Sequence, residues 1–364
     1  MEIKKIKNPI LIDKKKVGDG NPCYITFEIG ATHEGLESAK RLIKFASEAG
    51  ADAVKFQIFN PDRLISDKKQ LFSYEILKNR QTGESENIEE PLYDIFKRRW
   101  MSNNDWMDIK KYCDELGMAF FATVGFEEEI KLLEELNCHS IKIASADVNH
   151  HPLIRLAART GMCIQLDTGM SSIREIEQAV DVINSEGNKN IIIHQCPSGY
   201  PARLESINLK MIIELKKNFP YPIAFSDHTP GYEMDIAAIS LGANMIEKTI
   251  TENRMARSVE HIMSIEPNEM KLFVKQVRDL ETALGVGKRK MSEIELKKRD
   301  ENRRSLFLIE PAKKGQRIID CKIDFKRPGF GISPDQFERI KKKKLNKDLE
   351  TNHMISFNDF EQDH

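Results

Sequence analysis

The chain has 364 residues, and its 56 Lys and Arg against 57 Asp and Glu give a formal net charge of −1. This balance argues against a nucleic-acid-binding surface, which needs an excess of basic residues on one face. There is no run of about 18 apolar residues, so we expect no membrane span. The N-terminal MEIKKIKNPILIDKKK lacks the apolar stretch of a signal peptide. Six scattered cysteines without a CxxC pair are typical of reduced thiols, so we expect a cytoplasmic protein.

Short apolar segments alternate along the chain with stretches of helical spacing, which predicts βαβ units and a parallel sheet. The strand-like segments are residues 25–30, 53–57, 119–123, 140–145, 163–168, 191–196, 223–228 and 245–251. The helical spacing is clearest at residues 37–49, 105–116, 127–136, 173–183 and 267–284. Eight such units within about 260 residues match the usual size of a (β/α)₈ barrel. An open doubly wound sheet is disfavoured, because no GxGxxG turn follows the first predicted strand.

Residues 62–104 interrupt this rhythm with a long, charged and partly helical stretch after the second predicted strand. Long loops at that end of a barrel are often lids or substrate walls, and a merely solvated insertion is the alternative. Residues 285–302 are polar and highly charged, which predicts a linker. We therefore expect a barrel domain over residues 1–284 and, after the linker, a small β-rich module over residues 303–364.

Two histidines stand at the ends of neighbouring predicted strands. The strings IIIHQCPSGYP and IAFSDHTPG contain His194 and His228. Residues at the carboxyl ends of barrel strands face the active site. Two neutral imidazoles converging there could hold a divalent metal, and imidazole with oxygen ligands suits Mn²⁺, Mg²⁺, Co²⁺ or Zn²⁺. The alternative for either histidine is a hydrogen-bonded residue of the core.

Two lysines, Lys55 and Lys142, stand inside otherwise apolar predicted strands. Lysine is rarely buried without a counter-charge, so an anionic ligand such as phosphate is the expected partner. A salt bridge to Glu28 or Asp147 is the alternative. Glu28 ends the first predicted strand, where a carboxylate near two cations can orient water or take its proton.

Hydroxyl groups accompany these lysines. Ser145 follows Lys142 at strand spacing, and Thr123 ends the third predicted strand. Ser171 and Ser172 stand at the start of a predicted helix, where hydroxyls and free backbone N–H groups suit an anion. Plain N-capping of that helix is the alternative for both serines.

Eight strings spread along the chain carry a family resemblance: FEIGATHEG, GADAVKFQ, KIASADVNHHPLI, DTGMSSIREIEQAV, HQCPSGYPA, SDHTPG, SLGANMIEK and KRPGFGIS. Through them nearly the whole chain resembles the N-acetylneuraminate (sialic acid) synthase family. The resemblance implies a (β/α)₈ barrel that condenses phosphoenolpyruvate (PEP), followed by a small antifreeze-like (SAF) domain. It also implies a manganese-type divalent metal and a domain-swapped homodimer.

The resemblance assigns the site residues by role. PEP is bound by Lys55, Thr123, Lys142, Ser145, Ser171 and Ser172. The sugar is bound by Gln57, Tyr200, Asp227 and, from the small domain of the partner subunit, Arg327. The catalytic carboxylates are Glu28 and Asp147. The metal ligands are His194 and His228. The implied reaction joins PEP to the open-chain aldehyde of an N-acylamino hexose such as N-acetylmannosamine, with C–O cleavage and phosphate release.

One stretch departs from the family pattern. The sequence reads EKTIT after the eighth predicted strand, with Thr249 where histidine is usual, and the loop 252–263 carries the unusual Arg254 and Arg257. This loop is expected to line the sugar pocket, so the identity of the sugar stays open. A PEP-dependent synthase of another deoxy-sugar acid, acting on a phosphorylated or dideoxy sugar, is one alternative. A non-catalytic carbohydrate-binding protein is another.

Overall fold

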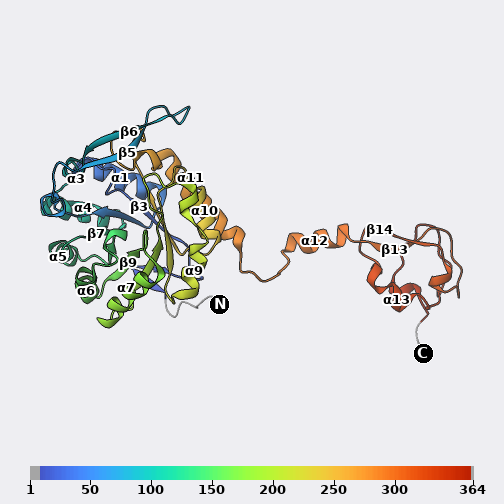
Figure 1. Cartoon of the computed structure of the whole chain (residues 1–364). Helices are drawn as coiled ribbons and strands as arrows, with labels where there is room; N and C mark the ends of the chain where they lie inside the picture. Colours follow the sequence, from blue (N-terminus) through green and yellow to red (C-terminus); the bar gives the residue numbers. More distant parts are fainter. Residues whose placement is uncertain (1–8, 362–364) are drawn as a thin grey trace. The chain divides into compact units, whose positions relative to one another are not determined.

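A computed structural model describes residues 9–361 of the chain. The chain divides after Gly285 into two compact units. The first unit contains a closed barrel, and the second contains a two-stranded sheet with short helical turns (Figure 1). Within the described residues, no helix is both long and apolar enough to cross a membrane.

Eight parallel strands close into the barrel, which confirms the predicted (β/α)₈ architecture. In pairing order they are β10 (Ile191–Gln195), β11 (Ile223–Asp227), β12 (Met245–Thr249), β3 (Tyr24–Glu28), β4 (Ala53–Gln57), β7 (Ala119–Thr123), β8 (Ser140–Ile143) and β9 (Cys163–Asp167). Each of the eight predicted apolar segments overlaps one of these strands. Their continuous burial agrees with strands that are covered on both faces.

A helix follows each barrel strand and covers the outside of the barrel (Figure 1). These helices are α1 (Leu36–Ala49), α4 (Asn103–Glu115), α5 (Glu127–Glu135), α6 (His151–Arg159), α7 (Ile173–Ser185), α9 (Met211–Asn218), α10 (Glu233–Ser240) and α11 (Pro267–Leu284). In α1, for example, Leu42, Ile43 and Ala46 recur at helical spacing and are fully buried. The five helices predicted from the sequence lie where they were expected.

Side chains of the barrel strands alternate between the helix layer and the barrel interior, as strand geometry requires. The lowest interior layer is apolar and is closed by the hairpin of β1 (Ile10–Ile12) and β2 (Lys15–Val17). Its members are Ile10, Ile12, Val17, Tyr24, Ala53, Phe121, Cys163, Ile192, Ala224 and Met245. The next interior positions along the same strands are mostly polar or charged, and they carry the candidate site.

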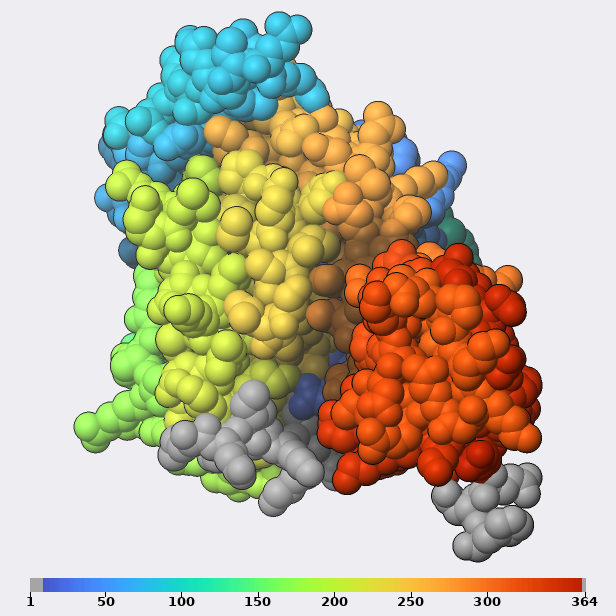
Figure 2. Space-filling model, turned by 90° about the vertical axis from the view of Figure 1, so that its right-hand side faces the viewer, coloured from blue at the N-terminus to red at the C-terminus, as the bar shows by residue number. Residues whose placement is uncertain are grey.

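The insertion at residues 62–104 is partly helical, as expected, and it also contains a β-hairpin that the sequence analysis did not predict. Strands β5 (Leu71–Leu77) and β6 (Ser85–Pro91) pair antiparallel and lie between the short helices α2 (Pro61–Leu64) and α3 (Leu92–Lys97). Figure 2 shows this hairpin projecting from one end of the barrel unit. At its base, Tyr74 and Ile95 pack against Val259, so the insertion contacts the loop that departs from the family pattern.

The second unit has a small apolar core of its own, formed by Leu306, Leu308, Ala312, Ile318, Ile332, Ile340, Leu345, Leu349, Ile355 and Phe360. Its sheet pairs β13 (Ser305–Leu308) with β14 (Ile323–Lys326), and α13 (Phe337–Ile340) follows the KRPGFG turn. The stretch predicted as a linker contains α12 (Glu293–Asn302), none of whose residues is buried.

Candidate functional site

A cavity of about 190 Å³ opens at the carboxyl ends of the barrel strands. Among the predicted site residues it is lined by Glu28, Lys55, Gln57, Thr123, Ser145, Tyr200 and His228. Its other polar or ionisable lining residues are Asp167, Cys196, Glu247 and Glu260. The barrel therefore brings together residues from all eight barrel strands or their ends at the face where such folds carry active sites.

Lys55 is the lysine that lines this cavity. It lies opposite Glu28 in the pairing of β3 with β4, and its Nζ is 2.6 Å from Glu28 Oε2 and 3.7 Å from Glu247 Oε1. Burial alone would lower the pKa of Lys55, but the two carboxylates outweigh it and raise the pKa above its usual value. The lysine is thus a permanent cation at 5% exposure.

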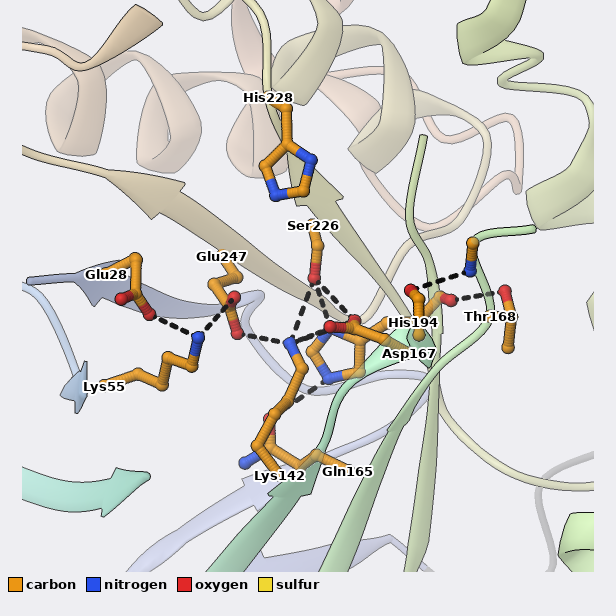
Figure 3. A network of polar contacts seen from close by, with 12 residues as sticks. Glu28, Lys55, Lys142, Gln165, Asp167, Thr168, His194, Ser226, His228 and Glu247 are labelled. Carbon is orange, nitrogen blue, oxygen red and sulfur yellow. Dashed lines mark hydrogen bonds and ion pairs between the residues drawn. The ribbon is translucent and has the colours of Figure 1, made fainter. Parts of the chain in front are cut away.

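Lys142 lies deeper and is fully buried. Its Nζ is 2.6 Å from Glu247 Oε2 and 3.0 Å from Asp167 Oδ1, and it donates to Ser226 Oγ at 3.1 Å (Figure 3). The expected counter-charge is present, but it comes from Glu247 and Asp167 instead of Asp147. Glu247 bridges the two lysines, which makes one continuous charge network from Glu28 to Asp167.

This network holds two lysines against three carboxylates, so one carboxylate charge is not matched. Burial is the largest effect on Glu28, followed by Lys55, which lowers its pKa, and Glu247, which raises it; the net result is a pKa of about 7. Burial also raises the pKa of Asp167, against the opposing effect of Lys142. For Glu247 the two lysines outweigh burial and lower its pKa. The spare proton of the network is therefore expected on Glu28 or Asp167.

Gly30 leaves the room that Glu28 needs. A Cβ at this position would lie 2.5 Å from the backbone nitrogen of Gln57 and 2.6 Å from Glu28 Oε1. Gln57 Nε2 also donates to Glu28 Oε1 at 3.3 Å. The carboxyl group is thereby held between Lys55 and Gln57 at the cavity wall.

His194 does not pair with His228, and its assignment as a metal ligand is corrected. His194 lies opposite Ala224 in the pairing of β10 with β11. Ala224 precedes His228 by four residues along the chain. Four residues of a strand span about 13 Å, so the two rings lie at different depths of the barrel (Figure 3). Both ring nitrogens of His194 are also engaged inside the protein, with Gln165 Oε1 at 3.0 Å and Ser226 Oγ at 2.9 Å.

The protonation state of His194 follows from these contacts. Gln165 Oε1 can only accept, so Nε2 of His194 carries the hydrogen and Nδ1 accepts from Ser226 or from Lys142, whose Nζ is 3.4 Å away. Burial, followed by Lys142, lowers the pKa of His194 well below its usual value. His194 is a neutral, hydrogen-bonded residue of the barrel interior, with no lone pair left for a metal.

His228 is placed differently. Its Nδ1 donates to the carbonyl oxygen of Pro197 at 2.9 Å, and its ring lies 4.6 Å from the ring of Tyr200. No hydrogen bond of the described residues uses Nε2, and the residue lines the cavity. Among the described residues there is no cluster of three or more His, Cys, Asp or Glu side chains suited to hold a metal. The two predicted histidines therefore do not converge, and His228 is the one of them that lines the cavity.

The predicted hydroxyl groups separate into two kinds. Thr123 and Ser145 line the cavity, and Ser145 Oγ accepts a hydrogen bond from the backbone of Gly169 at 2.9 Å. Ser172 is exposed and caps helix α7 through reciprocal hydrogen bonds with Glu175. Ser171 donates to the carbonyl oxygen of Gly169 and does not line the cavity. The capping alternative therefore describes Ser172.

Asp147 lies in a second cavity of about 350 Å³, which shares Gln57, Thr123, Ala144 and Ala146 with the first. Its side chain is half-buried, and burial raises its pKa. Because the two cavities share four wall residues, they adjoin. Asp147 therefore lines the adjoining cavity and not the one that Lys55 lines.

Asp227 faces away from the cavity, which corrects its assignment to the sugar. It alternates with the inward-facing Ser226 and forms a buried ion pair with Lys248 on the neighbouring strand. It also accepts from the backbone and hydroxyl of Thr229. Its role in this structure is to fix β11 against β12.

Replacing Asp227 by asparagine is expected to lower the free energy of unfolding by roughly 3–5 kcal/mol, because Lys248 loses its buried partner. The Michaelis constant for the sugar should stay unchanged in the folded fraction. Denaturant unfolding and sugar kinetics measure the two effects, and Asp147→Asn is the control with the opposite expected pattern. A raised Michaelis constant for the sugar without loss of stability would show instead that Asp227 binds the sugar.

Arg327 belongs to the second unit, where a tightly built turn presents it. Ser305 Oγ donates to the carbonyl oxygen of Pro328 at 2.7 Å and accepts from the backbone of Gly331 at 2.8 Å. A Cβ on Gly329 would lie 2.7 Å from Arg303 Cβ. Arg327 is exposed, and its guanidinium makes no ion pair or hydrogen bond within the part of the chain that the structure describes.

The sequence reasoning missed Glu247, Asp167, Gln165 and Ser226, which hold Lys142 and His194 in place. A signal for them was present. All four are polar residues at inward positions of predicted strands, and Gln165 and Asp167 are two residues apart, on the same side of one strand. A lysine inside the barrel needs such partners on the neighbouring strands.

Comparison with known proteins adds a family and several relatives. Residues 42–289 match the model of the NeuB family. The chain is 33% identical to the N,N'-diacetyllegionaminic acid synthase of Legionella pneumophila over 92% of this chain and 94% of that protein. It is 34% identical to the human N-acetylneuraminate-9-phosphate synthase over 74% of this chain and 73% of that protein. A crystal structure of N-acetylneuraminic acid (sialic acid) synthetase from Leptospira borgpetersenii matches with a TM-score of 0.70 and 28% identity, covering 81% of this chain and 96% of that chain.

Proposed function

The chain belongs to the NeuB family, and on that premise we propose that it condenses PEP with the open-chain aldehyde of an N-acylamino sugar. The products are a sugar acid and phosphate. The resemblance read from the sequence and the expectation of a synthase are confirmed by the family match and the names of the relatives. The observation that carries the proposal is the buried charge network that joins Glu28, Lys55, Glu247 and Lys142 at the cavity floor.

The proposed reaction has a balanced sequence of bonds. C3 of PEP attacks the aldehyde carbon, whose oxygen takes up a proton and becomes a hydroxyl. Water adds to C2 and loses a proton, and the C2–O bond breaks so that phosphate leaves with the bridging oxygen. The protein must therefore hold an anion, receive a proton from water and keep the aldehyde beside C3.

Lys55 is the cation proposed to meet the phosphate or carboxylate of PEP, because it lines the cavity while Lys142 lies beneath it. In the free enzyme both lysines are paired with carboxylates. An entering anion then has to displace a carboxylate from Lys55, or it has to be accompanied by protonation of Glu28. A carboxyl group with a pKa of about 7 can exchange its proton near neutral pH, as a general base for the attacking water requires.

PEP labelled with ¹⁸O in its bridging ester oxygen tests this chemistry. C–O cleavage places the label in the released phosphate, and this is the expected result. Label that remains in the organic product would indicate P–O cleavage and would contradict the proposed condensation.

A divalent metal, with Mn²⁺ first, remains part of the proposal because the resemblance implies it. His228 is the one predicted imidazole with a free nitrogen at the cavity, and His194 is excluded by its hydrogen bonds. Such an ion would polarise the sugar aldehyde. The metal content of His228→Ala and His194→Asn measures this directly: the first should lose the ion, whereas the second should keep it.

We also propose that the second unit is the antifreeze-like SAF domain and that it acts in a domain-swapped homodimer. Arg327 is exposed, is held by a rigid turn and is not paired within the described chain, as expected of a group that serves a site elsewhere. Exchange of an element between identical subunits is a low-cost route to a dimer.

Mixing two inactive variants, His228→Ala and Arg327→Ala, is expected to restore activity after subunit exchange. In each mixed dimer, one of the two sites then has both groups. Random exchange of equal amounts makes about half of the dimers mixed, so about a quarter of the wild-type activity is expected. Continued inactivity, with mixed dimers detected by native mass spectrometry, would show that Arg327 does not act across subunits.

A further inference from the structure

The second cavity is built from two parts of the chain. The ends of β4, β7 and β8 supply one wall, and the insertion at residues 62–104 supplies the other. The lining residues are Gln57, Ile58, Phe59, Leu64, Ile65, Leu92, Phe96, Thr123, Val124, Gly125, Ala144, Ala146 and Asp147. The insertion thus forms one wall of this cavity, which agrees with the expected substrate wall and not with a merely solvated insertion.

The wall from the insertion is apolar. Leu64 and Ile65 end helix α2, and Leu92 and Phe96 belong to α3. The ring of Phe96 packs edge-on against Phe59 with 4.5 Å between the centroids. Of the described residues that line this cavity, Asp147 is the single ionisable one. The cavity therefore offers polar groups at Asp147 and at Gln57 and Thr123, which it shares with the first cavity, and an apolar surface along the insertion.

Basic residues of the same two helices are directed elsewhere. Arg63 pairs with Glu128 and stacks on Phe126, 4.1 Å from the ring centroid. Lys97 lies over the ring of Trp100 at 5.1 Å. No lysine or arginine is among the described residues that line the cavity. A phosphate ester placed there would be desolvated without a cation, which is strongly unfavourable.

We propose that this cavity binds the end of the sugar acceptor farthest from its aldehyde, and that this end is a methyl group instead of a hydroxymethyl group or a phosphate ester. The assignment rests on the proposed function, which places the aldehyde in the first cavity beside Lys55. Because the two cavities share Gln57, Thr123, Ala144 and Ala146, an open-chain sugar continues from the first into the second. The substrate class is then an N-acylamino sugar deoxygenated at its distal carbon and not phosphorylated.

Three matched acceptors test the proposal: N-acetylmannosamine, its 6-deoxy analogue and its 6-phosphate. Phosphate release from PEP gives kcat/KM for each. We expect the 6-deoxy sugar to be preferred over N-acetylmannosamine by about 10- to 100-fold, the range over which an apolar pocket discriminates one small group. The 6-phosphate should be the poorest of the three.

Ile65→Thr is expected to reduce the preference for the 6-deoxy sugar, because it places a hydroxyl in the apolar wall. Leu64→Ser, at a side chain already 40% exposed, is the second variant in case the first does not fold. Ile76→Thr is the matched control, since Ile76 belongs to strand β5 of the same insertion but does not line the cavity. The control should leave the preference unchanged.

The outcomes separate this assignment from the proposed function. Turnover of the three sugars without preference, or preference for N-acetylmannosamine or its 6-phosphate, contradicts the distal-methyl assignment alone. A preference that is unchanged in both Ile65→Thr and Leu64→Ser also overturns it. No phosphate release with any of the three sugars contradicts the proposed function and this assignment with it.

Discussion

Lys55→Met is expected to weaken PEP binding by about 10- to 150-fold, because a hydrogen bond to a charged group contributes roughly 1.5–3 kcal/mol. Among the described residues that line the cavity, Lys55 is the one lysine, and the variant leaves Glu28 and Glu247 facing each other without the cation between them. An anion then meets two carboxylates in place of a salt bridge. The apparent Michaelis constant for PEP and direct titration with PEP measure the loss.

Lys216→Met is the matched control for this variant. Lys216 is also nearly buried and ion-paired, but its partner is Asp19 and it belongs to helix α9, outside the barrel interior. Both variants lose one buried lysine, yet only Lys55→Met should change PEP binding. If the two variants have the same PEP affinity as the wild type, Lys55 does not bind the anion.

The rate is expected to rise with pH through about 7, because Glu28 has a pKa of about 7 and acts in its charged form. Below this pH the carboxyl group is protonated and cannot take the proton of the attacking water. Glu28→Gln keeps the shape of the side chain but cannot ionise. The variant should therefore lose most of its activity, and its pH–rate profile should lose the inflection near pH 7. A Glu28→Gln enzyme that keeps both activity and inflection would assign the base to another group.

The same shift has a consequence for stability, with a definite sign. A carboxyl group whose pKa is raised in the folded state stabilises the fold fully below its unfolded value of about 4.3. That contribution is lost as pH rises through about 7, because burying the charged form is costly. As pH rises through about 7, Glu28 therefore contributes less to stability while its charged form becomes available for catalysis. Such an opposition is expected of an ionisable group in an active site.

The fold was predictable because barrel strands have a simple signature. Each is a short apolar run with an amphipathic helix after it, and every predicted segment overlaps an observed strand. The hairpin in the insertion was missed although Phe72, Tyr74 and Ile76 alternate along β5, because its partner β6 is largely exposed and carries mainly charged and polar residues. Exposed strands lack the apolar pattern on which such predictions depend.

The site was predictable in its residue types and less so in its pairings. Lys55, Glu28, Thr123 and Ser145 line the cavity as expected, since each stands at or near the end of a strand. The pairing of His194 with His228 was wrong because the sequence does not show the stagger of neighbouring strands. In a barrel that stagger moves a residue to another interior layer.

Two observations bear on the sugar, which the family resemblance leaves open. The insertion at residues 62–104 and the divergent loop 252–263 pack on each other through Tyr74, Ile95 and Val259. Arg99, at the end of the insertion, is buried and donates to Ser258 in that loop. The insertion and the loop 252–263 thus form one structural element beside the site.

Phosphate release from PEP in the presence and absence of an amino sugar tests the central claim most directly. With N-acetylmannosamine and its 6-deoxy analogue as acceptors, we expect phosphate only when a sugar is present, and one sugar acid for each phosphate. The mass of that product should equal sugar plus PEP plus water minus phosphoric acid. Phosphate released equally without sugar, or no such product with any acceptor, would contradict the assignment as a PEP-condensing sugar-acid synthase.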